Sequence, residues 1–272
     1  MLFSKMKLPS ALLLAAATLA SAQPTKRAGP YPSNYYTEDG LADHTIYFPD
    51  APPDNTSLPI LIWGNGACGF DGTAFANFLT NIASYGFLVI ASGVPGGQGS
   101  TTSQLMRDAI DWAVGVAGTG NYAGVDTENI AVAGQSCGGL EAYQLRDDER
   151  VTGLGIFNSG FVAGMGDDPS AISEVTKPTF YFLGGSSDIA YENGMRDYQA
   201  LTGVPKWVGN YPVGHGGTYS DVDGGAFGEA AVNWLQWLLK GDTTAAEFFT
   251  GGGAEAAGWQ ETASEGLEGL GA

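Results

Sequence analysis

Positive charge, cysteine and histidine are all scarce in this sequence. Its 272 residues include 11 Lys+Arg against 29 Asp+Glu, which gives a formal net charge of -18. Nucleic acids and anionic membrane surfaces are bound through basic patches, so we expect neither as a partner. Two Cys and two His are too few for a cysteine-rich zinc module or a fold held by several disulfides. We therefore expect no metal and no other cofactor.

Long hydrophobic runs are also missing beyond the N-terminus. The apolar stretch Leu8–Leu19 is too short to span a bilayer, and the lysines before it and Ala20-Ser21-Ala22 after it are typical of a secretory signal peptide. We assign residues 1–22 to that peptide. Residues 23–27 form a possible pro-segment that ends in the dibasic pair Lys26-Arg27. The expected protein is therefore secreted and extracellular, with no membrane span.

A single sequon, Asn55-Thr56-Ser57, predicts N-glycosylation at Asn55. It lies in a segment rich in proline and aspartate, which is typical of an exposed loop. This position fits a protein that passes through the secretory route.

Short apolar segments alternate with segments of helical periodicity along the rest of the chain. This pattern predicts an α/β fold with a mostly parallel sheet and helices on both of its faces. We assign residues 28–250 to one such domain, and 251–272 to a loosely held tail rich in Gly, Ala and Glu, with Trp259 and Leu267 as possible anchors. The expected strands are 45–48, 58–63, 87–91, 129–133, 154–157, 179–183 and 207–211, and the expected helices are 73–84, 104–116, 138–145, 189–201 and 226–239.

The most informative motif is Gly134-Gln135-Ser136-Cys137-Gly138, which matches G-x-S-x-G. An expected strand leads into it and an expected helix leaves it, as a nucleophile elbow requires. The glycines leave room for a strained serine between a strand and a helix. A glycine-rich turn without chemistry would have the same letters, so the motif needs partners.

A serine needs a base and an acid to act as a nucleophile, and in this kind of fold they follow it in the order acid, then base. His44 precedes the motif and is interpreted as a surface or strand residue. His215 follows the last expected strand in a glycine-rich loop, and we predict that it is the base. For the acid we favour Asp188, just past the strand 179–183. The alternatives are Asp167, Asp168, Glu192 and Asp197.

An oxyanion hole needs a second backbone N–H besides that of Cys137. The loop after the strand 58–63 reads Gly64-Asn65-Gly66-Ala67-Cys68-Gly69, and we predict the N–H of Asn65 as that donor. The same glycines would also make a simple tight turn. The Asn65 side chain is an alternative group for binding substrate.

These segments together resemble the secreted fungal branch of the α/β-hydrolase superfamily, and are similar to its dienelactone-hydrolase, chlorophyllase and polyester-hydrolase-like groups. The resemblance runs from Leu58 to Lys240 and rests on WGNGACG, FLVIASG, GQSCGG, FNSG, GGSSDIAY and GHGGTY. It implies a triad of Ser136, Asp188 and His215. Two departures are Trp63-Gly64, where many relatives have His-Gly, and Ser136, where dienelactone hydrolases use Cys. The second departure argues against that particular reaction.

The resemblance also bears on the two cysteines. In this fold the segments that carry Cys68 and Cys137 are neighbours across the active site, and two cysteines of a secreted protein are expected to pair. We therefore predict a Cys68–Cys137 disulfide that fixes the oxyanion loop to the elbow. Two buried free thiols are the alternative.

The expected substrates are neutral esters, because a strongly acidic surface repels anions. About 20 residues separate the strands 154–157 and 179–183, which is too short for a large lid domain, so bulky or polymeric esters are included. Phe161, Met165 and Tyr191 are candidate lining residues, of which we select Phe161 and Tyr191. We expect a monomeric serine ester hydrolase. The alternatives are cleavage of an amide or a lactone, or an inactive binding protein on the same scaffold.

Overall fold

The structure is a computed structural model that describes residues 29–52 and 56–271. The predicted signal peptide 1–22, the pro-segment 23–27 and the glycosylation site Asn55 lie outside the described residues. Within the described ranges, no helix is both long enough and apolar enough to cross a membrane.

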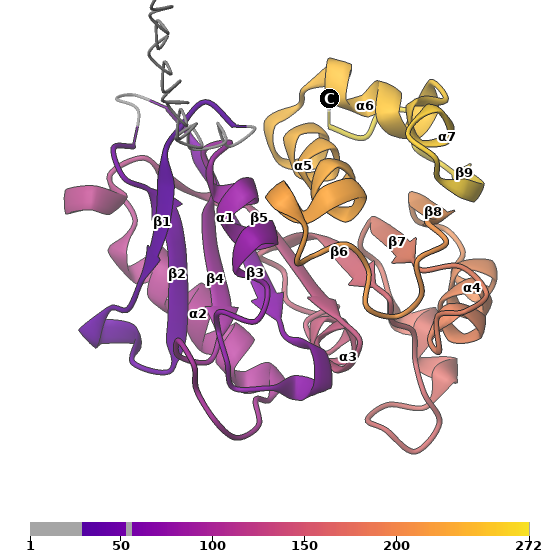
Figure 1. Ribbon diagram of the computed structural model, residues 1–272, viewed down its shortest axis with the longest axis horizontal. Coiled ribbons are helices and arrows are strands. Elements are labelled where there is room, and N and C mark those ends of the chain that lie inside the picture. The colour runs from indigo at the N-terminus through magenta and orange to yellow at the C-terminus, as the bar shows by residue number, and fades with distance from the viewer. Residues whose placement is uncertain (1–28, 53–55, 272) are drawn as a thin grey trace, which may run out of the picture.

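The centre of the fold is a nine-stranded sheet in the order β1-β2-β4-β3-β5-β6-β7-β8-β9 (Figure 1). The pairs from β4 through β3, β5, β6 and β7 to β8 are parallel, whereas β1–β2, β2–β4 and β8–β9 are antiparallel. The strands are β1 (Ser33–Tyr36), β2 (His44–Pro49), β3 (Leu58–Gly64), β4 (Leu88–Ser92), β5 (Val125–Gln135), β6 (Val151–Phe157), β7 (Thr179–Leu183), β8 (Lys206–Asn210) and β9 (Gln260–Glu265).

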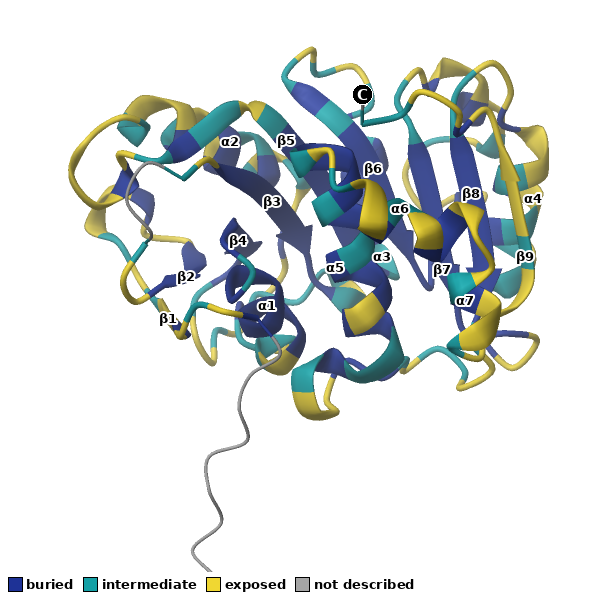
Figure 2. Ribbon diagram, turned by 90° about the horizontal axis from the view of Figure 1, so that it is seen from above, coloured by how far each residue is buried: buried dark blue, intermediate teal, exposed yellow. Residues whose placement is uncertain are grey.

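Helices cover both faces of this sheet, as the alternation predicted. One core contains side chains of α1, α5 and α6, and the other contains side chains of α2 and α3 with α4 packed against it. In Figure 2 the buried strands lie between these two helical layers, whose outer surfaces are exposed. The helices are α1 (Ala76–Ala83), α2 (Ser103–Val116), α3 (Cys137–Tyr143), α4 (Tyr191–Ala200), α5 (Gly225–Lys240), α6 (Thr243–Thr250) and α7 (Gly253–Ala256), with short 3-10 turns η1 (Asp39–Leu41), η2 (Gly66–Cys68), η3 (Gly120–Tyr122), η4 (Pro169–Glu174) and η5 (Val222–Gly224).

The strands at the centre are buried on both faces, which explains their continuous apolar sequences. Every residue of β3, β4 and β7 is buried. Trp63, at the end of β3, is fully buried, and its ring lies 5.3 Å from that of Phe75 and 5.0 Å from that of Phe78. Trp63, one of the two departures from the family that the sequence resembles, is therefore part of the core.

Helix α1 begins later than predicted, at Ala76 rather than Thr73. Asp71 accepts hydrogen bonds at Oδ1 from the backbone N–H of Thr73 at 2.9 Å and from its hydroxyl at 2.6 Å. These local bonds stabilise a turn in place of the first helical turn. His44 is on β2 as expected, but it is 2% exposed, and its Nε2 lies 2.8 Å from the Leu105 carbonyl oxygen.

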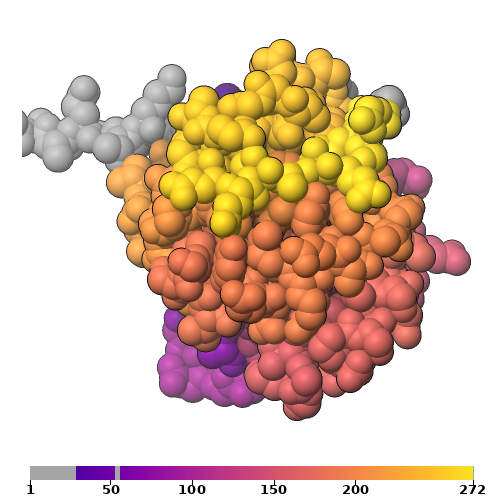
Figure 3. All heavy atoms as spheres, turned by 90° about the vertical axis from the view of Figure 1, so that its right-hand side faces the viewer, coloured from indigo at the N-terminus to yellow at the C-terminus, as the bar shows by residue number. Residues whose placement is uncertain are grey.

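The prediction of a loosely held tail is wrong. Strand β9 pairs with β8 as the edge of the sheet, and Trp259 and Leu267 are 2% and 5% exposed. Their burial confirms both as anchors. Figure 3 shows these C-terminal residues, in yellow, packed as a continuous layer over the neighbouring part of the fold. Because most of β9 is exposed, its polar sequence carries no apolar pattern that would have predicted a strand.

Candidate active site

Ser136 lies at a sharp turn between the end of β5 and the start of α3. Its backbone has φ 54° and ψ -117°, a conformation that non-glycine residues rarely adopt. The Ser136 N–H donates to the Phe157 carbonyl at 2.9 Å, and its own carbonyl accepts from the Ser159 hydroxyl at 2.7 Å. Bonds to the end of β6 and the residues after it therefore hold the strained turn in place.

Glycines around Ser136 permit a very close approach of backbones. A Cβ atom at Gly134 would lie 2.3 Å from the carbonyl carbon of Gly138, and a Cβ at Gly138 would lie 2.1 Å from the carbonyl oxygen of Gly64. Any side chain at either position would force the strands and α3 apart. The steric role expected of the two glycines is thus present in the structure.

The predicted nucleophile, base and acid lie in hydrogen-bond contact. The His215 Nε2 is 2.9 Å from the Ser136 Oγ, and its Nδ1 is 2.6 Å from the Asp188 Oδ1. A neutral imidazole that donates from Nδ1 to Asp188 presents a lone pair at Nε2 to the serine hydroxyl. This arrangement is able to remove the hydroxyl proton as the oxygen attacks an electrophile.

The loop that carries His215 is tied to two neighbouring segments. Gly214, with φ 77°, donates its N–H to the Gly184 carbonyl at 2.8 Å. The Gln135 side chain, beside the nucleophile, donates to the His215 carbonyl at 3.0 Å. Both bonds fix the imidazole over the end of the sheet.

Asp188 is the acid among the candidates, and it is 4% exposed. Its Oδ2 accepts from the Asn158 side chain at 2.7 Å and from the Gly184 N–H at 3.0 Å, while its Oδ1 also accepts from the Ala190 N–H at 2.9 Å. Together with His215, these donors occupy both oxygens of the carboxyl group and fix its orientation. Asn158 was missed by the sequence reasoning, although its place directly after β6, at the same edge of the sheet, was an available signal.

Three of the alternative acids bond other groups. Asp167 forms an ion pair with Arg146 at 2.8 Å, and Asp168 accepts from the Ser170 N–H. Asp197 accepts from the Phe161 N–H and the Tyr143 hydroxyl. Glu192 is in the first turn of α4. The structure brings Asp188, and none of these four, to His215.

The loop after β3 is held by the Asn65 side chain. Its Nδ2 donates to the carbonyl oxygens of Ser92, Gly69 and Asp71 at 2.7, 3.0 and 3.2 Å. The side-chain NH₂ is therefore occupied, whereas Oδ1 has no hydrogen-bond partner among the described residues, and the backbone N–H stays the predicted oxyanion donor. Ala67, with φ 54°, lies two residues further on and lines the cavity that contains Ser136.

Cys68 and Cys137 form the predicted disulfide, with their Cα atoms 5.1 Å apart. The bond joins the loop after β3 to the first residue of α3, directly beside the nucleophile. The Cys68 carbonyl also accepts from the Thr101 N–H at 2.7 Å, so a third segment is attached to the same point. The loop after β3 is thus covalently linked to the residue that follows Ser136.

Ser136 and His215 open into a cavity of about 380 Å³. Its rim includes two exposed apolar side chains, Met165 at 54% and Ile189 at 80%. The other lining residues are Ala67, Cys137, Leu140, Asn158, Ser159, Gly160, Val162, Ala190 and Asn193. Leu140, Val162, Ile189 and Asn193 were not selected from the sequence, because isolated residues in loops and helices carry no motif.

The two residues predicted to contact substrate, Phe161 and Tyr191, are not in the described lining of the Ser136 cavity. Phe161 is 1% exposed, and its ring is stacked on Tyr143 at 4.0 Å. It lines a neighbouring cavity, whose other walls include the disulfide. Tyr191 donates its hydroxyl to Glu261 at 3.0 Å, and the described lining of the Ser136 cavity includes neither residue.

Within residues 29–52 and 56–271, no group of three His, Cys, Asp or Glu side chains is placed to hold a metal ion. Neither the family models nor the curated proteins compared with the chain match it. The case for its chemistry therefore depends on the geometry of its own residues.

Proposed function

We propose that this protein is a secreted serine hydrolase of the α/β-hydrolase superfamily that cleaves neutral carboxylic esters. The observation that carries the proposal is the contact of one imidazole with both Ser136 and Asp188, at 2.9 and 2.6 Å. It is supported by the strained serine at a strand–turn–helix junction and by the parallel sheet that brings the three segments together.

The first half of the reaction forms an acyl-enzyme. The Ser136 Oγ attacks the ester carbonyl carbon while His215 takes the hydroxyl proton, and Asp188 stabilises the resulting imidazolium. The negative oxygen that develops faces backbone N–H donors, for which we propose Cys137 and Asn65. The C–O bond to the alcohol then breaks, and His215 returns its proton to the leaving oxygen.

The second half repeats these steps with water. His215 accepts a proton from the water molecule as the water oxygen attacks the acyl carbon. The bond to the Ser136 Oγ breaks, the serine recovers its proton, and the carboxylic acid leaves. All of these proton transfers go through the Nε2 of His215, while its Nδ1 keeps a proton in the hydrogen bond to Asp188.

Ester substrates of considerable size fit the proposal. Met165, Ile189 and Val213 are 54%, 80% and 44% exposed around the loops that carry the triad. A net charge of -18 disfavours anionic substrates, whereas neutral esters, including polymeric ones, approach without repulsion. The disulfide and the predicted signal peptide agree with action outside the cell.

A fluorophosphonate probe and p-nitrophenyl esters test this function. We expect the probe to label the wild-type protein and not Ser136→Ala, and we expect Ser136→Ala and His215→Ala each to lose nearly all ester hydrolysis. Both variants should unfold within about 1 kcal/mol of the wild type, because neither change removes a large buried side chain. Absence of labelling in the wild type would favour an inactive binding protein, and turnover of amides or lactones alone would redefine the substrate.

A further inference from the structure

A second cavity of about 390 Å³ lies beside the one that contains Ser136. The two cavities share Cys137, Leu140 and Met165 in their linings. The second cavity extends from this shared wall past Cys68 to the start of α2 at Ser103. A molecule bound at Ser136 therefore lies next to the second cavity, and these three residues stand at the boundary between the two.

Proton transfer decides which part of an ester lies on which side. His215 must reach the leaving oxygen of the alcohol, so the alcohol lies on the His215 side of the serine. His215 lines the first cavity, and the described lining of the second does not include it. The lining of the second cavity includes instead both residues of the disulfide, Cys68 and Cys137, and the N–H of Cys137 is a predicted oxyanion donor.

We propose that the second cavity is the acyl pocket of this enzyme and that it accepts an uncharged, apolar acyl chain. The inference rests on the proposed function, since it needs an acyl group attached to Ser136. It also identifies a role for Phe161, which lines this second cavity, as part of an acyl-binding wall.

The walls of the pocket determine the chemistry of the chain. Leu140, Phe161, Met165 and the disulfide present apolar atoms to the pocket. Burial of an aliphatic chain against them is favourable by roughly 0.8 kcal/mol for each methylene group. The uncharged polar residues of the lining are Thr101, Thr102, Ser103 and Gln144, and its acidic residues are Glu141 and Asp167, the second of which is paired with Arg146.

Glu141 adds discrimination against anions. It is 6% exposed, its Oε1 accepts from the Thr101 hydroxyl at 2.8 Å, and its Oε2 has no hydrogen-bond partner among the described residues. Burial raises its pKa to about 7. Glu141 brings no positive charge, and the described lining contains no Lys, Arg or His, so a carboxylate at the end of an acyl chain would lose its hydration without a cation to pair with. Half-esters of dicarboxylic acids are therefore expected to be poor substrates.

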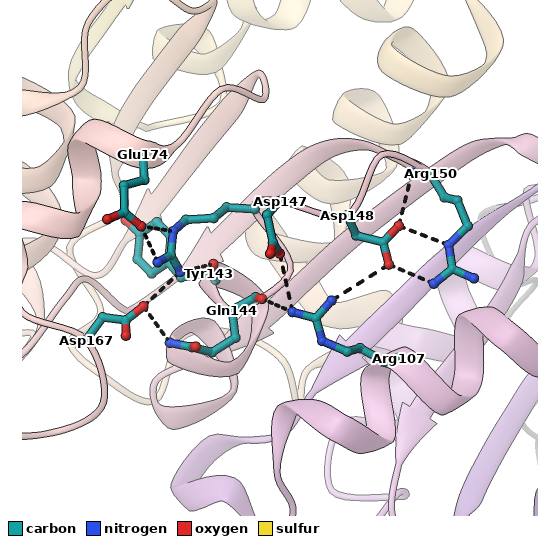
Figure 4. A network of polar contacts seen from close by, with 9 residues as sticks. Arg107, Tyr143, Gln144, Asp147, Asp148, Arg150, Asp167 and Glu174 are labelled. Carbon is teal, nitrogen blue, oxygen red and sulfur yellow. Dashed lines mark hydrogen bonds and ion pairs between the residues drawn. The ribbon is translucent and has the colours of Figure 1, made fainter.

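Ion pairs hold one wall of the pocket in place. Asp167, two residues after Met165, lies 2.8 Å from Arg146 and accepts from the Gln144 side chain at 2.9 Å (Figure 4). Arg146 also contacts Glu174 at 2.6 Å, and Arg107 donates to the Gln144 carbonyl. Because α3 and the segment around Met165 are joined in this way, we expect the pocket to limit chain size rather than adapt to it.

The test compares p-nitrophenyl acetate with the butanoate and octanoate esters. In the wild type, kcat/KM should rise at least ten-fold from acetate to octanoate. Ser103 is half-buried and lines the second cavity, so Ser103→Trp fills it; the octanoate-to-acetate ratio should then fall at least ten-fold. An anionic half-ester such as p-nitrophenyl succinate should react at least ten-fold more slowly than the butanoate.

Asn193→Trp is the matched control, because Asn193 lines the Ser136 cavity together with His215 and is absent from the described lining of the second cavity. It should leave the octanoate-to-acetate ratio unchanged and lower the rate for bulky alcohols instead. A fall of the ratio in Asn193→Trp, with no change in Ser103→Trp, would assign the acyl chain to the other side and overturn the proposal.

A covalent adduct gives a readout that does not depend on the variants. Ethyl p-nitrophenyl octylphosphonate should attach to Ser136, and a crystal structure of the adduct should show the octyl chain against Leu140 and Phe161. A chain seen beside Ile189 and Asn193 would refute the acyl pocket while leaving the hydrolase function intact. Failure of Ser136 to react with any phosphonate would refute both.

Discussion

Two buried carboxyl groups belong to segments around the nucleophile, and they differ in how completely their oxygens are hydrogen-bonded. Asp188, after β7, accepts from His215, Asn158 and two backbone N–H groups. Glu141, in α3, accepts one hydrogen bond, from Thr101, and its second oxygen has no partner among the described residues. Both side chains are less than a tenth exposed.

The number of hydrogen-bond donors around a buried carboxyl group decides what burial does to it. Several donors make up for the water that Asp188 loses, so its charge is available to orient and stabilise the imidazole. Glu141 lacks such donors, so burial favours its neutral form and raises its pKa to about 7. The region of Asp188 is built to hold a charge, whereas the region of Glu141 is built to exclude one.

The largest expected effect comes from Asp188→Asn. An amide that presents its NH₂ group to Nδ1 stabilises the tautomer in which Nε2 carries the proton, and that tautomer does not accept from Ser136. We expect kcat for p-nitrophenyl esters to fall roughly 10⁴-fold. Asp168→Asn is the control, because Asp168 caps η4 and its activity should stay within about two-fold of the wild type. Equal activity of both variants would mean that Asp188 does not orient the base.

The next effect concerns the disulfide, whose Cys137 lies in the same helix, α3, as Glu141. Its cysteines are separated by 69 residues, and a cross-link of this length stabilises a fold by roughly 4 kcal/mol in the chain-entropy model. We expect the double variant Cys68→Ser/Cys137→Ser to lose stability of this order, measured by urea unfolding.

The kcat of the double variant should fall about ten-fold, because the oxyanion loop is no longer fixed to α3. It is measured without urea, at a temperature where circular dichroism shows that the variant is folded. Dithiothreitol should have the same effect on the wild type and none on the double variant. An unchanged kcat would show that the three hydrogen bonds of Asn65 position this loop without the disulfide.

The sequence predicted the parts of the fold and site that leave a local signature. Apolar runs located the strands from β2 to β8. The order acid, then base after Ser136 selected His215, and the place of Asp188 just past a predicted strand selected it from the candidate acids. These features are set by strand burial and by the requirement that the carboxyl ends of parallel strands share one edge.

Features that depend on contacts distant in sequence were not predicted. Strand β9 is recognisable only through its pairing with β8, and β1 only through its pairing with β2. The groups that donate to Asp188 come from several loops, and the missing partner of one Glu141 oxygen also depends on several segments. The sequence of one segment alone therefore does not predict these contacts. Phe161 was selected because it is aromatic. Its ring stacks on Tyr143, and it lines the second cavity rather than the cavity that contains Ser136.

Glu141→Gln should change how stability depends on pH. The folded-state pKa of about 7 lies above the ordinary value of 4.5, so the native state binds more protons between these values and wild-type stability falls as pH rises through that window. The whole change is about 3 kcal/mol, and stability levels off above pH 7. Gln carries no charge, so the variant should lack this decline. Urea unfolding from pH 4.5 to 7.5 measures it.

The control for this prediction is Glu174→Gln. The Glu174 side chain is 62% exposed, so its replacement should preserve the decline of the wild type. His44, whose pKa burial lowers, and Asp197, whose pKa burial raises, contribute equally to all three proteins. The difference between the wild-type and Glu141→Gln curves therefore reports Glu141, and parallel curves would mean that its carboxyl is already charged in the native state.

The smallest effect tests how far the support of Asp188 extends. The Tyr219 hydroxyl donates to the Asn158 side-chain oxygen, and the Asn158 amide donates to Asp188. Tyr219→Phe removes the outer bond of this chain and should cost about 1 kcal/mol of stability. We expect kcat to fall about three-fold with little change in KM, because Asn158 holds Asp188 less precisely.

Tyr47→Phe is the matched control for Tyr219→Phe, since the buried Tyr47 hydroxyl donates to the Gly72 carbonyl at 2.7 Å. It should lose similar stability and retain kcat. Equal kcat values in the two variants would limit the support of Asp188 to the groups that touch it.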